Sequence, residues 1–142
     1  MSFNMRDLLV IGVLIAFSFI FSTIKITGNL TLELVPIFLA LFVFKDFKAA
    51  IIGFISHLLI ASMSGFETYT LIGHIIMASS IALMLVLASL LIKKFNNITA
   101  FGFIFMFNVL VVPLSVYLVI PFSLDQYSSI FNNLALSTLF NL

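Results

Sequence analysis

Residues 56–74, SHLLIASMSGFETYTLIGH, place two histidines on either side of a short polar break, Ser64-Gly65-Phe66-Glu67, that separates two apolar runs. If the runs are helices, each histidine lies about 10–13 Å from the break, because an α-helix rises about 1.5 Å per residue. The hydrocarbon core of a membrane is about 30 Å thick, so both imidazoles would lie well inside it. Ionisable side chains at that depth are costly and usually face a cavity or a bundle interior. This hairpin is therefore the first candidate for a ligand site.

The composition around this hairpin is that of a membrane protein. Of the 142 residues, 63% are hydrophobic and 8% are charged, whereas a soluble domain has roughly 25% charged residues. We therefore expect an all-α integral membrane protein in which residues 1–142 form one transmembrane domain. The chain has no cysteine, which excludes disulfides and thiolate metal sites, and its net charge of +1 gives no reason to expect nucleic acid.

Apolar runs and turn signals along the chain predict a six-helix transmembrane bundle. Polar turns at Thr27-Gly28-Asn29 and Lys45-Asp46-Phe47-Lys48 separate the first three runs, and Pro113 and Pro121 are expected to bend or end the fifth. The sixth run is short for a full crossing, so the sixth helix is expected to be short or truncated. The predicted spans are residues 8–26, 32–44, 49–63, 69–92, 100–122 and 127–142.

The cations predict the orientation of this bundle. In the alternating topology all of them except Lys25 fall on one side, namely Arg6, Lys45, Lys48, Lys93 and Lys94. By the positive-inside rule, the N-terminus and this side are cytoplasmic. The loop at residues 64–67 is then extracellular, and both histidines open toward the outside of the cell.

The two helices of the hairpin carry matching polar stripes. His57 and Ser64 share a face of the third span, and Glu67, Thr70 and His74 share a face of the fourth, because helical residues three, four or seven apart lie together. Antiparallel helices joined by a short loop are neighbours, so the stripes can face each other. We expect a substrate-binding pocket here, with walls formed by Met63, Phe66, Tyr69 and Met77.

Two other readings of the histidines remain open at this point. Each histidine could simply hydrogen-bond a neighbouring helix, as polar side chains in membrane bundles often do. Histidine with glutamate also suits metal or proton chemistry, but the sequence has neither a third nitrogen ligand nor an HExxH spacing. We therefore predict no metal site and no cofactor.

Polar and small residues on other spans extend the candidate set. Asn108 lies in the middle of the fifth span, where an amide needs a partner from another helix or from a ligand. Glu33, at the outer start of the second span, suits either ligand contact or a helix-capping role. Gly12 and Ala16 form a small-xxx-small pair on the first span, a spacing that lets another helix approach closely and so indicates a protein partner.

These features together resemble the substrate-binding S components of energy-coupling factor (ECF) vitamin transporters. The resemblance rests on spans one to four: Met5-Arg6-Asp7, Gly12-xxx-Ala16, Glu33-Leu34-Val35-Pro36-Ile37, and a third span rich in glycine and alanine. Within that superfamily, the stretch from His57 to His74 is most similar to the S components assigned to α-ribazole, a building block of cobalamin.

The resemblance implies a subunit of an ABC importer in the bacterial cell membrane, which binds a vitamin or vitamin precursor from the extracellular side. It also implies association with a transmembrane T component, on which Gly12 and Ala16 would pack, and with two cytoplasmic ATPases. The chain has no Walker A motif, so ATP hydrolysis would belong to those partners rather than to this chain. Ser2 stands where the metal-transporting relatives have histidine, which disfavours nickel or cobalt uptake. The short sixth segment departs from the family pattern, in which the sixth helix helps to form the site.

Two other classes of protein fit parts of the sequence. A small membrane enzyme could use Glu67 and His74 as an acid/base pair, although the paired aspartates of prenyl chemistry are absent. A structural assembly subunit would use its polar side chains only to hold helices together.

Overall fold

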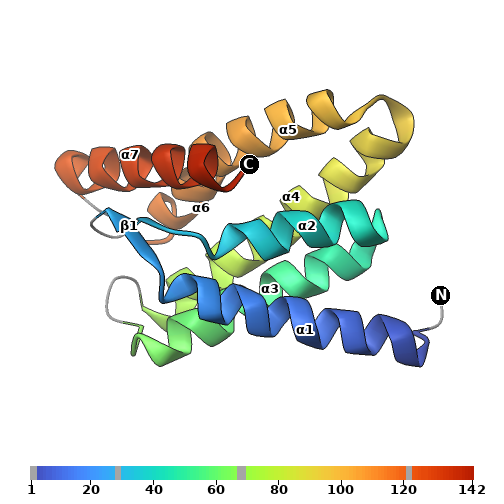
Figure 1. Cartoon of the computed structure of the whole chain (residues 1–142). Helices are drawn as coiled ribbons and strands as arrows, with labels where there is room; N and C mark the ends of the chain where they lie inside the picture. The colour runs from blue at the N-terminus through green and yellow to red at the C-terminus, as the bar shows by residue number, and fades with distance from the viewer. Residues whose placement is uncertain (1–2, 28–29, 67–69, 121–122) are drawn as a thin grey trace.

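The computed structural model describes residues 3–27, 30–66, 70–120 and 123–142. Within these residues the chain is helical except for one short two-stranded hairpin and the connecting turns (Figure 1). In chain order the elements are α1 (Met5–Ser22), β1 (Lys25–Thr27), β2 (Leu30–Thr31), α2 (Leu34–Phe44), α3 (Phe47–Met63), α4 (Leu71–Lys94), α5 (Asn97–Met106), the π-helical turn η1 (Phe107–Val111), α6 (Val112–Tyr117) and α7 (Leu124–Asn141). Since α5, η1 and α6 run on without a break, the described residues form six helical rods.

Three of these rods are long and apolar enough to cross a membrane, which indicates a membrane protein. They are α1, α4 and the continuous helix Asn97–Tyr117. The helices α2 and α3 are also apolar but have only 11 and 17 residues. At a rise of about 1.5 Å per residue, α2 is about 16 Å long, roughly half of a hydrocarbon core. The predicted second span is therefore only a half-length helix.

The observed helices differ from the predicted spans mainly at the C-terminal ends of the first and fifth spans. The predicted first span ran to residue 26, but α1 ends at Ser22, and Lys25 pairs with Thr31 in an antiparallel hairpin that the sequence reasoning missed. This segment is rich in β-branched residues, which favour extended backbone. The fifth rod ends at Tyr117 rather than at residue 122, and Pro121 lies outside the described residues.

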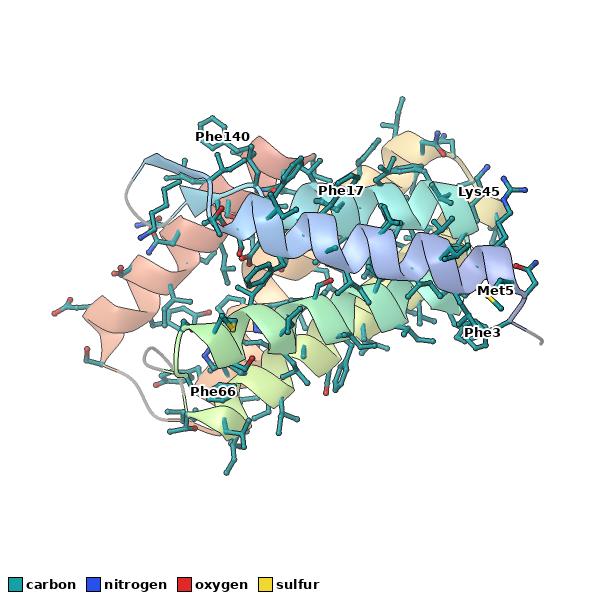
Figure 2. The ribbon with its side chains drawn as sticks, turned by 60° about the horizontal axis from the view of Figure 1, so that its bottom comes forward. Phe3, Met5, Phe17, Lys45, Phe66 and Phe140 are labelled. Carbon is teal, nitrogen blue, oxygen red and sulfur yellow. The ribbon has the colours of Figure 1, made fainter. Side chains whose placement is uncertain are left out.

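The connections alternate between two ends of the molecule, as an up-and-down bundle requires. The N-terminus, the α2–α3 turn and the α4–α5 turn lie at the right in Figure 1, and the β1–β2 hairpin and the α3–α4 connection lie at the left. Lys45 and Phe66, labelled in Figure 2, mark these two ends. At the right end, Lys48 of α3 forms an ion pair of 2.8 Å with Asp7 of α1, which ties the starts of the two helices together.

Helix starts at the right end are fixed by short polar side chains. Asn4 and Asp7 form a reciprocal capping box at the start of α1. Asp46 accepts a hydrogen bond from the backbone of Lys48 at the start of α3, and Asn96 accepts one from Thr99 at the start of α5. The start of α2 differs, because Glu33 occupies the capping position but its side chain forms no capping bond.

The apolar core lies between α1 to α5. Leu41, Ile52, Met84, Leu85 and Ile104 are completely buried there. Gly53 makes the close approach of α3 and α4 possible, because a Cβ at this position would lie 2.5 Å from Leu85 Cδ1 and 3.1 Å from Ile81 Cγ2.

The bend expected at Pro113 takes the form of the π-helical turn η1. Proline has no amide hydrogen to donate to the carbonyl four residues earlier, so the α-helical ladder cannot continue through it. The chain instead widens by one residue, and the amide of Val112 donates to the carbonyl of Phe107. Such π turns occur often at functional sites, and this one contains Asn108.

We expect Gly53→Ala to lower the free energy of unfolding by about 1–3 kcal/mol, because the added methyl group overpacks the α3–α4 contact. Gly102→Ala is the matched control, since a Cβ at Gly102 meets nothing within 4 Å and alanine is a better helix former than glycine. Chemical denaturation in detergent micelles measures both variants. Equal stability of the two variants would contradict this account of the core.

Candidate functional site

His57 of α3 and His74 of α4 are in direct contact. The distance from His57 Nε2 to His74 Nδ1 is 3.3 Å, and the ring centroids are 5.4 Å apart. One nitrogen donates and the other accepts, according to the tautomers of the two rings. His74 is buried, with 7% of its surface exposed, and His57 is half-buried. The two predicted stripes thus meet at their histidines, while the role of these residues in substrate binding stays a prediction.

The end of α3 brings a phenylalanine onto this pair. Gly65 and Phe66 have positive φ angles of 71° and 57°, and their amides donate to the carbonyls of Ser62 and Ala61 respectively. This pattern is a Schellman motif, for which glycine is the preferred residue at the first left-handed position. The second left-handed residue turns the chain so that the Phe66 ring lies 5.6 Å from the ring of His74. We call Phe66, His57 and His74 the histidine cluster.

The two histidines touch although they lie at different distances from the ends of their helices. Since α3 ends at Met63 and α4 begins at Leu71, the connection is longer than the four-residue break predicted. His57 therefore lies about 9 Å from the end of its helix, whereas His74 lies in the first turn of α4, about 5 Å from its start. The cluster is nearer to the end of the bundle than predicted.

Other members of the predicted pocket lie elsewhere. Ser64 is exposed and its hydroxyl donates to the carbonyl of Ala61 at 2.9 Å, and Thr70 is exposed at the start of α4. Met63, predicted as a pocket wall, has 69% of its surface exposed at the end of α3. Met77 is buried, but it packs against α6 through Val112 and Val116. Glu67 and Tyr69 lie outside the described residues.

Asn108 and the start of α2 form a second polar group, around α7. The Asn108 side chain is buried and its Nδ2 donates to Thr138 Oγ1 at 2.6 Å. At the start of α2, Asn141 Oδ1 accepts the amides of Leu34 and Val35 at 3.1 and 3.0 Å. Asn141 thus provides the cap that was one of the two roles predicted for Glu33. We call Asn108, Thr138 and Asn141, with the two amides, the α7 contact.

Glu33 takes part in this second group through its backbone. Its carbonyl accepts a hydrogen bond of 2.6 Å from the hydroxyl of Ser18, a completely buried residue of α1. The hydrogen bonds of the described residues therefore divide the predicted site into the histidine cluster and the α7 contact.

The sequence reasoning missed five buried polar residues among those described, namely Ser18, Ser56, Ser89, Thr138 and Asn141. Thr138 and Asn141 lie three residues apart on one face of α7, and this helical spacing was the available signal. Ser56 is completely buried and its hydroxyl has no hydrogen-bond partner among the described residues. Nothing in the sequence distinguishes Ser56 from the many serines that bond back to their own helix.

The remaining predictions concern α1 and metal ions. Gly12 and Ala16 both lie on the exposed face of α1, and a Cβ at Gly12 would meet nothing within 4 Å. A partner helix could reach this face, but the partner stays a prediction. Among the described residues, no three histidine, cysteine, aspartate or glutamate side chains gather closely enough to hold a metal ion.

The fold and the two polar groups define an apolar helical protein with hydrogen-bonding side chains in its interior. Comparisons with protein-family models, with curated proteins and with solved structures give no match to this chain. The functional interpretation therefore rests on the residues and their contacts.

We expect Ser56→Ala to raise the free energy of unfolding by up to about 1 kcal/mol, because a buried hydroxyl without a partner is costly and the methyl group removes that cost. Ser89→Ala is the control on the neighbouring helix, since Ser89 is also buried but donates to the carbonyl of Val86 at 2.7 Å. Denaturant titration in micelles compares the two. A loss of stability in Ser56→Ala would show that Ser56 has a partner.

Proposed function

We propose that the chain is the substrate-binding S component of an ECF-type importer, which captures a vitamin or vitamin precursor such as α-ribazole from the extracellular side of a bacterial cell membrane. The observation that carries the proposal is the histidine cluster, in which two imidazoles meet beneath an aromatic ring at one end of an apolar bundle. Imidazole nitrogens can donate and accept hydrogen bonds, and aromatic rings provide apolar contact area. Ionisable groups at membrane depth are retained mainly where they serve a function.

The distribution of charge supports binding from the outside. The ion pair between Lys48 and Asp7, together with Lys45, belongs to the end of the bundle opposite Phe66 (Figure 2). Under the positive-inside rule, the end with the cations is cytoplasmic, along with the N-terminus. The histidine cluster then lies near the extracellular surface, where an importer meets its substrate. In this proposal all six helical rods belong to the transmembrane bundle.

The energy for uptake would come from other proteins. We assign ATP hydrolysis to two cytoplasmic ATPases and transmembrane coupling to a T component. The exposed Gly12 and Ala16 of α1 provide a surface on which a helix of the T component can pack closely. The chain itself would bind substrate without catalysing a reaction.

One specific observation favours a second candidate, a structural assembly subunit. The 3.3 Å contact between the histidines can itself join α3 to α4, so the pair needs no ligand to be satisfied. The two candidates differ in what happens when the histidines are replaced. An assembly subunit loses stability only, whereas an S component loses substrate affinity with the bundle still folded.

We expect one member of a vitamin panel that includes α-ribazole to raise the melting temperature of the purified protein, since a ligand at 100 times its Kd stabilises the folded state by about 2.7 kcal/mol. His57→Ala and His74→Ala should each weaken binding about tenfold or more, because each removes a hydrogen-bonding group from the site. Isothermal titration measures the affinity.

Ser79→Ala is the control for these variants. Ser79 is exposed on α4, and its hydroxyl donates to the carbonyl of Ile75 on its own helix at 2.8 Å, so substrate affinity should not change. If no vitamin in a broad panel shifts the melting temperature, the S-component proposal fails. If both histidine variants keep full affinity for a vitamin that does bind, the histidine cluster is not the site.

A further inference from the structure

The C-terminal helix α7 places two polar side chains, and no apolar one, in the fully buried interior among its described side chains. Its apolar contacts are partly buried, with Leu134 packed against Val112 and Val116 and the Tyr127 ring 5.4 Å from that of Tyr117. Among the α7 residues whose side chains the structure describes, only Thr138 and Asn141 are buried, with 0% and 5% of their surface exposed. The other helices differ, since α1 to α5 each contribute buried apolar residues to the main core. Figure 1 shows α7 lying along one side of the bundle, beside α5 and α6.

Asn141 makes the more extensive of the two attachments. Its Oδ1 accepts the first two amides of α2, and its Nδ2 donates to the carbonyl of Thr31 in β2 at 2.9 Å and to that of Ser137 at 2.7 Å. The third residue of α2 is Pro36, which has no amide hydrogen. One side chain of α7 therefore caps α2 and holds β2 at the same time.

Thr138 makes the second attachment. Its hydroxyl donates to the carbonyl of Leu134 and accepts the amide of Asn108, both at 2.6 Å. One of the two N–H donors of Asn108 Nδ2 is thereby occupied within the protein. As long as α7 is in place, that Nδ2 hydrogen bond is not available to a substrate.

We propose that α7 is a latched lid: Asn141 and Thr138 hold it closed over η1 and the start of α2, and its release frees Asn108 to bind substrate. Lipid tails remove the hydrophobic driving force between helices, so close packing and interhelical hydrogen bonds hold a helix in place, and the fully buried contacts of α7 are hydrogen bonds. An element held by few contacts belongs to the part of a protein that opens most readily. The substrate role of Asn108 rests on the function proposed above, whereas the latch itself does not.

The first experiment tests the latch without any substrate. In lipid nanodiscs, Asn141→Leu should speed hydrogen exchange in the peptide that covers residues 31–38 by about tenfold, since the amide of Leu34 loses its acceptor and that of Val35 keeps only the carbonyl of Leu32. Thr138→Val should do the same for the peptide that covers residues 105–112, through loss of the bond to Asn108. Peptides of α3 should keep their wild-type rates in both variants.

Asn133→Leu is the matched control, because Asn133 is exposed on the same helix and receives the same substitution. Its exchange rates should equal those of the wild type. Equal rates in Asn141→Leu and Asn133→Leu would overturn the latch. A uniform increase across all helices of Asn141→Leu would overturn it too, because it would mean global destabilisation rather than the release of one helix.

The second experiment locks the lid. Thr31 and Ser137 both accept from Asn141 Nδ2, so they lie close together, and the chain has no native cysteine. The double variant Thr31→Cys with Ser137→Cys can be joined by a short bismaleimide. The association rate of α-ribazole should fall about tenfold or more on crosslinking, while the double variant without crosslinker should bind like the wild type.

An unchanged association rate in the crosslinked protein would overturn gating by α7. If the wild type does not bind α-ribazole, two claims are refuted: that this substrate binds and that α7 gates its binding. The exchange experiment would then still decide whether α7 is a latch, so the two failures are distinguishable.

Discussion

Polar side chains inside an apolar helical bundle have to find their partners within the protein, because the surrounding lipid offers none. In this protein, the need for internal partners accounts for the hydrogen bonds that polar side chains form between helices. His57 meets His74 across the α3–α4 hairpin, and Asn108 meets Thr138 across η1 and α7. Asn141 satisfies the start of α2, where the helix lacks a cap of its own. Each of these hydrogen bonds joins two helices, so the polar groups hold the bundle together. A substrate that binds at either group would have to compete for these hydrogen bonds.

The two polar groups differ in how they are supported. The histidine cluster stands on α3 and α4, which pack closely because Gly53 leaves room for Leu85 and Ile81. Its geometry is therefore rigid, and the Schellman motif fixes Phe66 beside it. The α7 contact lies outside the main apolar core, and its apolar support comes from the partly buried Leu134 against Val112 and Val116. Under the proposed function, a substrate would reach the histidine cluster by movement of α7 without opening of the α3–α4 core.

The sequence predicted the helical class, the alternation of the connections and the neighbourhood of the two histidines, because these follow from apolar run length, cation placement and hairpin connectivity. The limits of α3 were predicted to within two residues, since polar residues mark both of its ends. The sequence reasoning failed where backbone detail decided the outcome. The start of α4 at Leu71 placed His74 in the first turn of its helix, and β-branched residues turned the end of the first span into a hairpin. Capping of α2 by Asn141 depends on residues more than a hundred positions apart, which no local pattern reveals.

The central claim is that the histidine cluster binds a small molecule. The chain has only two histidines, so ¹⁵N-histidine labelling reports on this cluster alone. Imidazole ¹⁵N spectra of the protein in lipid nanodiscs, recorded while α-ribazole and the other vitamins of the panel are added, test the claim most directly. The account predicts that the resonances of both rings shift together and saturate with one vitamin. Unchanged imidazole resonances at a vitamin concentration that stabilises the protein against heat would contradict it.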